Sequence, residues 1–349
     1  MKVAIISPLI ESVPPKLYGG TERVVSYLCE ELVRQGHDVT LFASGDSVTR
    51  ARLRPMVERS LRLDERCHDP NSHHIIMVDR VIEAASEFDV LHFHLDYCHF
   101  PLVRRLGLPS VTTMHGRLDL KEYIRVYSYF RDVPLVSISD AQRAPIPDNN
   151  WVATIHHGLP RDLYPFHAQP GSYLAFIGRI SPEKRPDRAI AIARRAKMPL
   201  KIAAKVDAVD RSYFEARIRP LLSGADVEFI GEISDVQKRD FIGNARAVLF
   251  PIDWPEPFGL VMIESMACGT PVIAWRCGSV PEIMVDGETG RVVESEDEAV
   301  DAVERIHELD RHRCRDVFDE RFTVERMARD YVEAYAQRAE GSDRRLRVA

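Results

Sequence analysis

The sequence lacks the features that mark several large classes of protein. Its six cysteines are scattered at positions 29, 67, 98, 268, 277 and 314, and none belongs to a Cys-x-x-Cys pair, so their spacing predicts no disulfide framework. No apolar run approaches the ~20 residues that a transmembrane helix needs. The first residues do not resemble a signal peptide. Scattered thiols without an export signal favour a cytoplasmic protein with reduced cysteines.

The chain also lacks an excess of positive charge. It contains 47 Lys and Arg against 53 Asp and Glu, which gives a formal net charge of −6. Because nucleic-acid binding relies on basic surface, we expect no nucleic-acid partner. The composition, with 45% hydrophobic and 29% charged residues, is that of an ordinary globular protein. Its 349 residues correspond to roughly two domains of ~150 residues each.

The hydrophobic pattern alternates between short apolar strands and amphipathic helices. Residues 3–6 form a β-rich apolar run of the kind that is buried in a parallel sheet. Thr21 is placed to cap the helix that follows, in which the apolar residues between positions 24 and 33 fall on one face. Gly36 ends this helix and residues 37–42 start the next strand, which completes a βαβ unit.

Further strands are expected along both halves of the chain. They cover residues 89–94, 110–114, 134–139 and 152–156 in the first half, and 173–178, 200–204, 227–230, 247–250 and 271–274 in the second. Helices are expected at 75–88, 186–196, 259–268 and 323–339, and a proline-containing linker at 158–172. The pattern predicts an α/β fold class with two doubly wound domains around a central cleft and boundaries near residues 165 and 322.

Two strand-to-helix turns carry residues suited to an anionic ligand, which in such sheets binds beyond the carboxyl ends of the strands. Gly19 and Gly20 precede a helix, where glycine lets a ligand approach the backbone N–H groups. The alternative is a loop that only shapes the turn. Arg179 and Lys184 lie five residues apart between a strand and a helix and suit a diphosphate. On spacing alone, surface charge at a helix entry is the favoured interpretation and diphosphate binding the alternative.

The segment 253–274 contains the most specific pattern. Glu256 lies in a proline-bounded loop at the end of a strand, and residues 258–260 begin a helix with free N–H groups. Glu264 follows eight residues after Glu256, on a helix that is otherwise almost wholly apolar. A carboxylate on a buried helix needs a charged or hydrogen-bonding partner, which either the protein or a ligand can supply.

Taken together, the sequence resembles the retaining glycosyltransferases of family 4, which have the GT-B fold. The resemblance extends from the first strand to about residue 335 and is strongest in the second half. The residues that carry it are Gly19-Gly20, His115-Gly116, Gly178-Arg179, Glu183-Lys184, and the Glu256/Glu264 pair within Glu-Pro-Phe-Gly-Leu. The sequence departs from the family at His157-Gly158-Leu159-Pro160, where Asn-Gly-Val-Asp is frequent, and this departure bears on the linker geometry.

The resemblance implies a role for each part of the chain. Residues 1–165 would be a Rossmann-like acceptor-side domain, 166–322 the nucleotide-sugar donor domain, and 323–349 a helix returning to the first domain with a basic tail. Of the catalytic residues, His115 would contact the sugar, Arg179 and Lys184 the diphosphate, and Glu256 the sugar hydroxyls. The donor-binding residues would be Gly19, Gly20, Phe258, Gly259, Leu260 and, on the ribose, Glu264.

The implied activity is that of a cytoplasmic hexosyltransferase. It would move a sugar from a nucleotide diphosphate donor, with UDP-glucose as the first expectation, to a sugar, small metabolite or lipid. Peripheral contact with the inner face of a membrane is compatible with a lipid acceptor. The chain has no Asp-x-Asp pair for a metal-bound diphosphate, so we expect no metal and no other cofactor, with Arg179 and Lys184 in the metal's place. Retention would follow same-face attack, in which a donor phosphate oxygen takes the acceptor proton.

Two alternatives come from other functional classes. A sugar-nucleotide epimerase of the same architecture would need acid and base groups at the sugar C2, and the Glu-x7-Glu pattern argues against it. A non-catalytic nucleotide-sugar-binding subunit would have no need to retain the complete set of site residues. That set is His115, Arg179, Lys184, Glu256 and Glu264.

Other clusters have a functional and a structural interpretation. The densest group of metal-ligand types is His92, His94, Asp96, Cys98 and His99, and a second group is Cys67, His68, His73 and His74. For both, a structural role is the favoured interpretation and a metal site the alternative. The arginines of segment 50–66 form either a solvated face or a contact for an anionic acceptor or lipid. The aromatic residues Tyr123, Tyr127 and Phe130 favour core packing over acceptor stacking.

Overall fold

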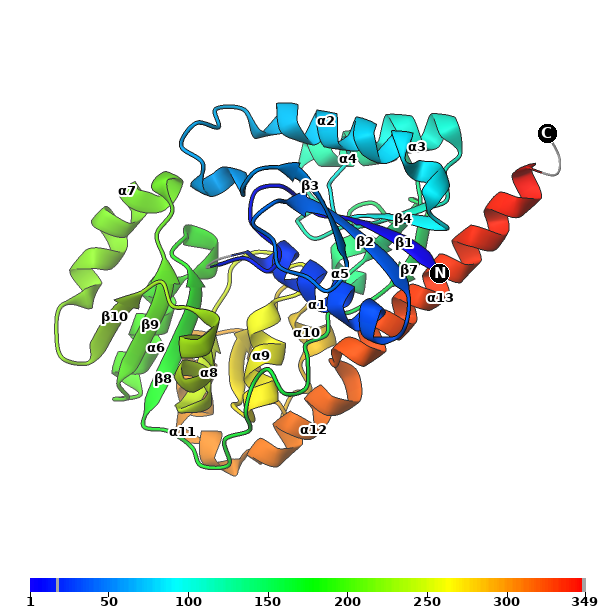
Figure 1. Cartoon of the computed structure of the whole chain (residues 1–349). Helices are drawn as coiled ribbons and strands as arrows, with labels where there is room; N and C mark the ends of the chain where they lie inside the picture. Colours follow the sequence, from blue (N-terminus) through cyan, green and yellow to red (C-terminus); the bar gives the residue numbers. More distant parts are fainter. Residues whose placement is uncertain (17–18, 347–349) are drawn as a thin grey trace. The chain divides into compact units, whose positions relative to one another are not determined.

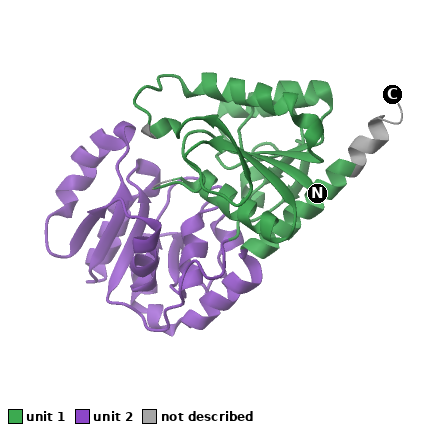
Figure 2. Ribbon diagram, in the orientation of Figure 1, with its two compact units in different colours: residues 1–158, 324–349 green, residues 159–323 purple. Residues whose placement is uncertain are grey.

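The computed structural model describes residues 1–16 and 19–346, and the side chains of residues 63 and 340–346 are left out of the description. The chain divides into two compact units (Figure 2). Unit 1 combines Met1–Gly158 with the C-terminal segment from Val324, and unit 2 is Leu159–Thr323. The chain thus leaves unit 1 a few residues before the expected boundary at 165, and it returns close to the expected position.

Unit 1 contains a parallel seven-stranded sheet with the order β3-β2-β1-β4-β5-β6-β7. Its strands are β1 (Lys2–Ile6), β2 (Asp38–Ser44), β3 (Arg52–Val57), β4 (Val90–Phe93), β5 (Ser110–Thr113), β6 (Leu135–Ser137) and β7 (Trp151–Thr154). The central strands are buried on both faces, which is why their sequences are almost continuously apolar. The order reverses between β1 and β4, as in a doubly wound fold.

Helices cover both faces of this sheet. They are α1 (Gly20–Arg34), α2 (Pro70–Glu83), α3 (Phe100–Leu106), α4 (Lys121–Tyr129), α5 (Asp140–Arg143) and α13 (Val324–Leu346). Figure 1 shows α2, α3 and α4 along one face, where their apolar side chains form a core with residues of β1, β2, β4 and β6. On the other face α13 packs against α1, β4 and β5. The final helix therefore returns to the first sheet.

Unit 2 contains a parallel six-stranded sheet with the order β10-β9-β8-β11-β12-β13. Its strands are β8 (Tyr173–Arg179), β9 (Leu200–Lys205), β10 (Val227–Gly231), β11 (Ala245–Phe250), β12 (Val272–Trp275) and β13 (Gly290–Val293). Its helices are α6 (Pro186–Arg195), α7 (Arg211–Tyr213), α8 (Asp235–Gly243), α9 (Leu260–Cys268), α10 (Val280–Ile283), α11 (Glu296–Glu304) and α12 (Arg311–Arg321). The core on one face joins α6 and α11 to the strands, and α9 packs against α8 and α12.

The predicted fold class is confirmed, while several local predictions are wrong. The strand β3 was not expected because its sequence is rich in arginine, and its place at the sheet edge tolerates this composition. The helix α2 begins at Pro70 rather than at 75, because the Asp69 side chain accepts the N–H of Asn71 and Pro70 suits the first helical position. Thr21 does not cap α1, which begins at Gly20.

Candidate functional site

The strand order of unit 2 reverses between β8 and β11, and loops from these two strands meet there. Arg179 is the last residue of β8, and a 3₁₀ turn at Pro182–Lys184 follows it. The N–H of Asp253, in the loop after β11, donates to the carbonyl of Glu183 over 2.8 Å. The two loops are thereby joined at the switch point of the sheet, which is where doubly wound folds bind their ligands.

Lys184 and Glu256 form an ion pair at this switch point. The Lys184 ammonium contacts Oε2 of Glu256, and the side chains are only 18% and 12% exposed. The indole N–H of Trp254 donates to the same Oε2 over 3.0 Å. The Lys184 ammonium also lies 4.9 Å from the centre of the Trp254 ring, a distance that permits a cation–π interaction. The two predicted residues therefore lie together, in contact with a tryptophan that was not predicted.

The segment after β12 fixes the loop that carries Glu256. The Cys277 thiol donates to the carbonyl of Trp254 over 2.9 Å, and the N–H of Ser279 donates to the carbonyl of Glu256 over 3.0 Å. Gly278, at φ +56°, lies between them, and a Cβ atom there would stand 2.3 Å from the backbone nitrogen of Glu256. Only glycine allows this approach without displacing the loop.

Carboxylates surround the guanidinium of Arg179. It contacts Glu183, and it lies 3.4 Å from Oδ2 of Asp210 and 3.9 Å from Oδ2 of Asp207. Burial raises the pKa of Asp210. The positive charge of Arg179 is thus balanced by carboxylates of the protein. A diphosphate bound there would compete with these carboxylates for Arg179.

The helix α9 starts immediately after this loop and follows Phe258. Its N-cap is Gly259 at φ +82°, and within the described part of the chain no side chain caps the helix start at Leu260. A Cβ atom at Gly259 would lie 2.7 Å from Cε of Met262. The first N–H groups of α9 are therefore not satisfied by a side-chain cap, and the positive end of the helix dipole lies beside the Glu256 loop.

Glu264 has a protein partner on the neighbouring helix. Its side chain is only 3% exposed, and Oε1 lies 2.6 Å from the ammonium of Lys238 on α8. This contact answers the question that the sequence left open, because a carboxylate buried on an apolar helix needs such a partner. A role on a ribose would have to be shared with Lys238.

His115 belongs to unit 1, directly after β5. Its Nε2 lies 2.8 Å from Nδ1 of His94, and its ring stacks on that of His157 with centroids 5.4 Å apart. Burial lowers the pKa of His115 to about 3, so the imidazole is neutral near neutral pH. The neutral ring can offer one donor and one acceptor, but it does not supply a fixed charge.

The Gly19-Gly20 turn, also in unit 1, has a packing role. A Cβ atom at Gly19 would stand 2.8 Å from Cβ of Pro15, so the absence of a side chain lets the two loop segments approach each other. The helix α1 starts at Gly20 without a side-chain cap. This geometry supports the turn-shaping interpretation, and a contact with a ligand remains a prediction.

The histidines near the end of β4 form hydrogen bonds with hydroxyl groups of unit 1. His92 contacts the hydroxyls of Thr113 and Tyr335, each over 2.7 Å, and His99 contacts that of Thr112 over 2.7 Å. Among the side chains that the structure describes, no group of three or more His, Cys, Asp or Glu is arranged to hold a metal ion. In the second cluster, His74 accepts the N–H of Leu9 over 3.0 Å, which is a structural role.

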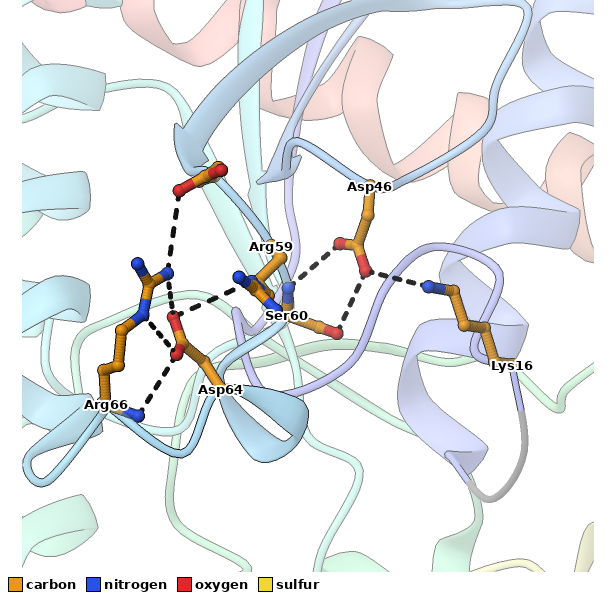
Figure 3. Close-up of polar contacts among 7 residues, drawn as sticks. Lys16, Asp46, Arg59, Ser60, Asp64 and Arg66 are labelled. Carbon is orange, nitrogen blue, oxygen red and sulfur yellow. Dashed lines mark hydrogen bonds and ion pairs between the residues drawn. The ribbon is translucent and has the colours of Figure 1, made fainter.

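The arginine-rich segment of unit 1 is largely neutralised by carboxylates. The pairs are Arg50 with Glu30, Arg54 with Glu87, Arg59 with Asp64, Arg62 with Glu11, and Arg66 with both Asp64 and Glu58. Figure 3 shows part of this network, in which Asp46 also bridges Lys16 and Ser60. The Arg66 guanidinium holds the pKa of Asp64 well below its usual range. These pairs favour the solvated-face interpretation over an anionic contact.

The aromatic residues after His115 follow the core interpretation. Tyr127 is buried with 1% exposure, and Tyr123 and Phe130 pack against the same core.

No helix among the described residues is long and apolar enough to cross a membrane. All six cysteines are free.

Sequence reasoning missed three contributors to the site in unit 2. They are Trp254, Lys238 and the Asp207/Asp210 pair. Trp254 could have been found, since it lies two residues before Glu256 and its indole offers a donor. Lys238 and the two aspartates are distant along the sequence from the residues they contact, and no local pattern marks them.

Comparison with known families gives two matches on separate parts of the chain. The profile described as Glycosyl transferases group 1 matches residues 166–318, and that described as Glycosyltransferase Family 4 matches residues 18–136. Together they span more than half of the chain. The first match contains Arg179, Lys184, Glu256 and Glu264, and the second contains His115.

Individual relatives and solved structures point the same way. A Mycobacterium tuberculosis glycogen synthase is 24% identical over 330 residues, which cover 79% of each chain. The structure of AviGT4, a glycosyltransferase involved in avilamycin A biosynthesis, has a TM-score of 0.76 at 25% identity and covers 97% of this chain and 98% of its own. Anabaena Alr3699/HepE in complex with UDP-glucose has a TM-score of 0.74 at 17% identity, over 97% and 100% of the two chains.

Proposed function

The chain belongs to glycosyltransferase family 4, the glycosyl transferases group 1, with the GT-B fold, and we propose that it transfers a hexose from a nucleotide diphosphate donor with retention of configuration. The observation that carries this proposal is the contact of Lys184 with Glu256 at the switch point of unit 2, next to the uncapped start of α9. A cation, a carboxylate and backbone N–H groups at a helix start can together hold a diphosphate and the hydroxyls of its sugar.

The proposed chemistry depends on charge that develops when the nucleotide leaves. Departure of a nucleoside diphosphate builds negative charge on its terminal phosphate, and preorganised cations lower the barrier to that step. Lys184 and Arg179 supply the cations, and the N-terminus of α9 supplies N–H donors at Leu260 and the residues before it. A phosphate oxygen of the donor takes the proton of the acceptor hydroxyl, which attacks from the same face, so no protein nucleophile is required.

The donor we propose is UDP-glucose, and the acceptor is a hydroxyl compound of unassigned class. Support for the donor comes from the Anabaena structure, which is a complex with UDP-glucose. The site cations, Arg179 and Lys184, take the place of a metal ion. His115, Gly19 and Gly20 stay predictions from the family resemblance, to be tested by their own variants.

A thermal-shift panel of UDP, GDP, ADP and dTDP with their common sugars tests the proposal. A ligand present at 100 times its dissociation constant adds about 2.7 kcal/mol of stability. We expect the uridine series alone to raise the melting temperature, and EDTA to leave both this shift and the hydrolysis or transfer of UDP-glucose unchanged. Stabilisation by another nucleotide series would correct the donor. No stabilisation by any of them would favour the non-catalytic alternative, and loss of activity in EDTA would revive a metal mechanism.

A further inference from the structure

Trp254 lies in the loop after β11 of unit 2, and its side chain contacts two charged residues, Glu256 and Lys184. Its indole N–H donates to Oε2 of Glu256 over 3.0 Å, and its ring lies under the Lys184 ammonium at 4.9 Å. The carbonyl of Trp254 accepts hydrogen bonds from the Cys277 thiol over 2.9 Å and from the N–H of Glu256 over 2.8 Å. The residue is thereby fixed through its backbone as well as its side chain.

The arrangement leaves the two oxygens of Glu256 in different states. Oε2 receives both the Lys184 ammonium and the Trp254 N–H, whereas Oε1 has no hydrogen bond from any residue that the structure describes. An ionised carboxylate has about four lone-pair sites, divided between its two oxygens. The lone pairs of Oε1 can therefore accept a hydrogen bond from an incoming hydroxyl or N–H group. Trp254 and Lys184 hold one oxygen and so fix the direction in which the other is presented.

We propose that Trp254 is the positioning residue of the donor site, which orients Glu256 toward the hydroxyls of the donor sugar and holds Lys184 in place for the diphosphate. The inference rests on the proposed transferase function. The indole N–H, by holding Oε2 of Glu256, fixes the direction of Oε1 and so supports the part of donor affinity that depends on the sugar. The face of the indole ring holds the Lys184 ammonium in place.

Trp151 provides a matched control in unit 1. Its indole N–H also donates over 3.0 Å, but to the backbone carbonyl of Ile146, and the Arg143 guanidinium lies 5.4 Å from the centre of its ring. Trp151→Phe therefore removes the same kind of hydrogen bond and keeps the same kind of ring contact, with partners other than Glu256 and Lys184. A loss of general stability alone would affect both variants in the same way.

The test compares Trp254→Phe with Trp151→Phe by calorimetric titration with UDP and with UDP-glucose. The wild-type protein should bind UDP-glucose more tightly than UDP, and Trp254→Phe should reduce that sugar-dependent gain roughly tenfold while leaving UDP affinity within about threefold, since hydrogen bonds to charged groups are the stronger ones. Trp254→Leu, which also removes the ring face, should in addition weaken UDP binding. Trp151→Phe should match the wild type in both titrations.

A double-mutant cycle shows whether Trp254 acts through Glu256. In a Glu256→Gln background, Trp254→Phe should change UDP-glucose affinity by less than about twofold, because the effects of residues in contact are not additive. Equal sugar-dependent gains in Trp254→Phe, Trp151→Phe and the wild type would overturn the positioning role while leaving the transferase proposal intact. Failure of the wild-type protein to bind any nucleotide sugar would overturn both.

Discussion

At the scale of single residues, Glu256 combines a predicted role in sugar binding with specific contacts to two other residues. The motif predicts a carboxylate at the sugar, and the structure holds one of its oxygens between Lys184 and Trp254. A neutral amide of the same shape would lose the attraction to Lys184 and offer a weaker acceptor to the sugar hydroxyls.

Glu256→Gln should therefore lower kcat by about 100-fold or more with little change in melting temperature, since several kcal/mol of transition-state stabilisation can depend on one such group. The measurement is steady-state turnover of the donor identified in the panel, together with a thermal melt. Glu228→Gln is the matched control, because Glu228 pairs with Lys201 at 3.1 Å on the exposed surface of the same unit and its loss should cost almost nothing. Turnover within a few-fold of wild type in Glu256→Gln would remove Glu256 from the mechanism.

At the scale of elements, the site depends on a loop that a second loop holds in place. The segment after β12 approaches the Glu256 loop so closely that Gly278 has no room for a Cβ atom, which would stand 2.3 Å from a backbone nitrogen. Backbone cannot move aside as a flexible side chain can, so a substitution at this position is transmitted to the loop that carries Glu256.

Gly278→Ala should lower kcat/KM more than tenfold, because about 1 Å of displacement at a catalytic group can cost about 100-fold in rate. Gly287→Ala is the matched control in the same unit. Gly287 also has a positive φ, at +81°, but its nearest neighbour to a new Cβ atom is Nη1 of Arg291 at 3.5 Å. Both variants pay the backbone penalty of about 1–2 kcal/mol for a left-handed alanine, which thermal melts will report. If both variants retain equal activity, the proposed link between the two loops is wrong.

At the scale of the whole molecule, unit 1 contains five histidines that burial keeps neutral. They are His92, His94, His99, His115 and His157, and burial lowers the pKa of each. For His99 and His115 the pKa falls to about 3. In the unfolded chain these groups titrate near 6.5, so between about pH 3 and 6.5 the unfolded state binds more protons than the folded state. Stability therefore rises with pH across that window and is lost as the pH falls.

Three carboxyl groups act in the opposite direction, because burial raises the pKa of Glu22, Asp96 and Asp210. Burial raises the pKa of Glu22 from 4.5 to about 7, so between those values the folded state binds the additional proton and stability falls as the pH rises. Five histidines outnumber these three carboxyl groups, and each proton taken up on unfolding changes the free energy of unfolding by about 1.4 kcal/mol per pH unit. The net expectation is acid destabilisation that begins just below neutral pH.

Urea unfolding at about pH 7, 6 and 5, at constant ionic strength, measures this effect. The midpoint should fall at each step, and calorimetry should place the larger change in the transition of unit 1, which contains all five histidines. A variant such as His99→Leu, which removes one titrating group, should flatten the slope below pH 6.5. A midpoint that stays constant from pH 7 to 5 would contradict the assignment of neutral, buried rings.

The sequence by itself determined the two α/β series, the final helix after the second sheet, and the local motifs at Arg179, Lys184 and Glu256. These features follow from hydrophobic period, turn residues and spacing, which are written along the chain. The arginine-rich strand β3 and the start of α2 were missed, because an edge position and a capping side chain are properties of the folded context.

Only the tertiary structure decided which charges meet. Glu264 pairs with Lys238 across two neighbouring helices, α9 and α8. Lys184 pairs with Glu256, and Arg179 with Asp207 and Asp210, at the carboxyl ends of different strands and in the loops that follow them. Such loops become neighbours through the strand order of a doubly wound sheet, which places β8 beside β11 although two other strands lie between them in the sequence. The orientation of Glu256 by Trp254 has the same origin, since a hydrogen bond depends on distance and angle in the folded loop, which the order of residues does not specify.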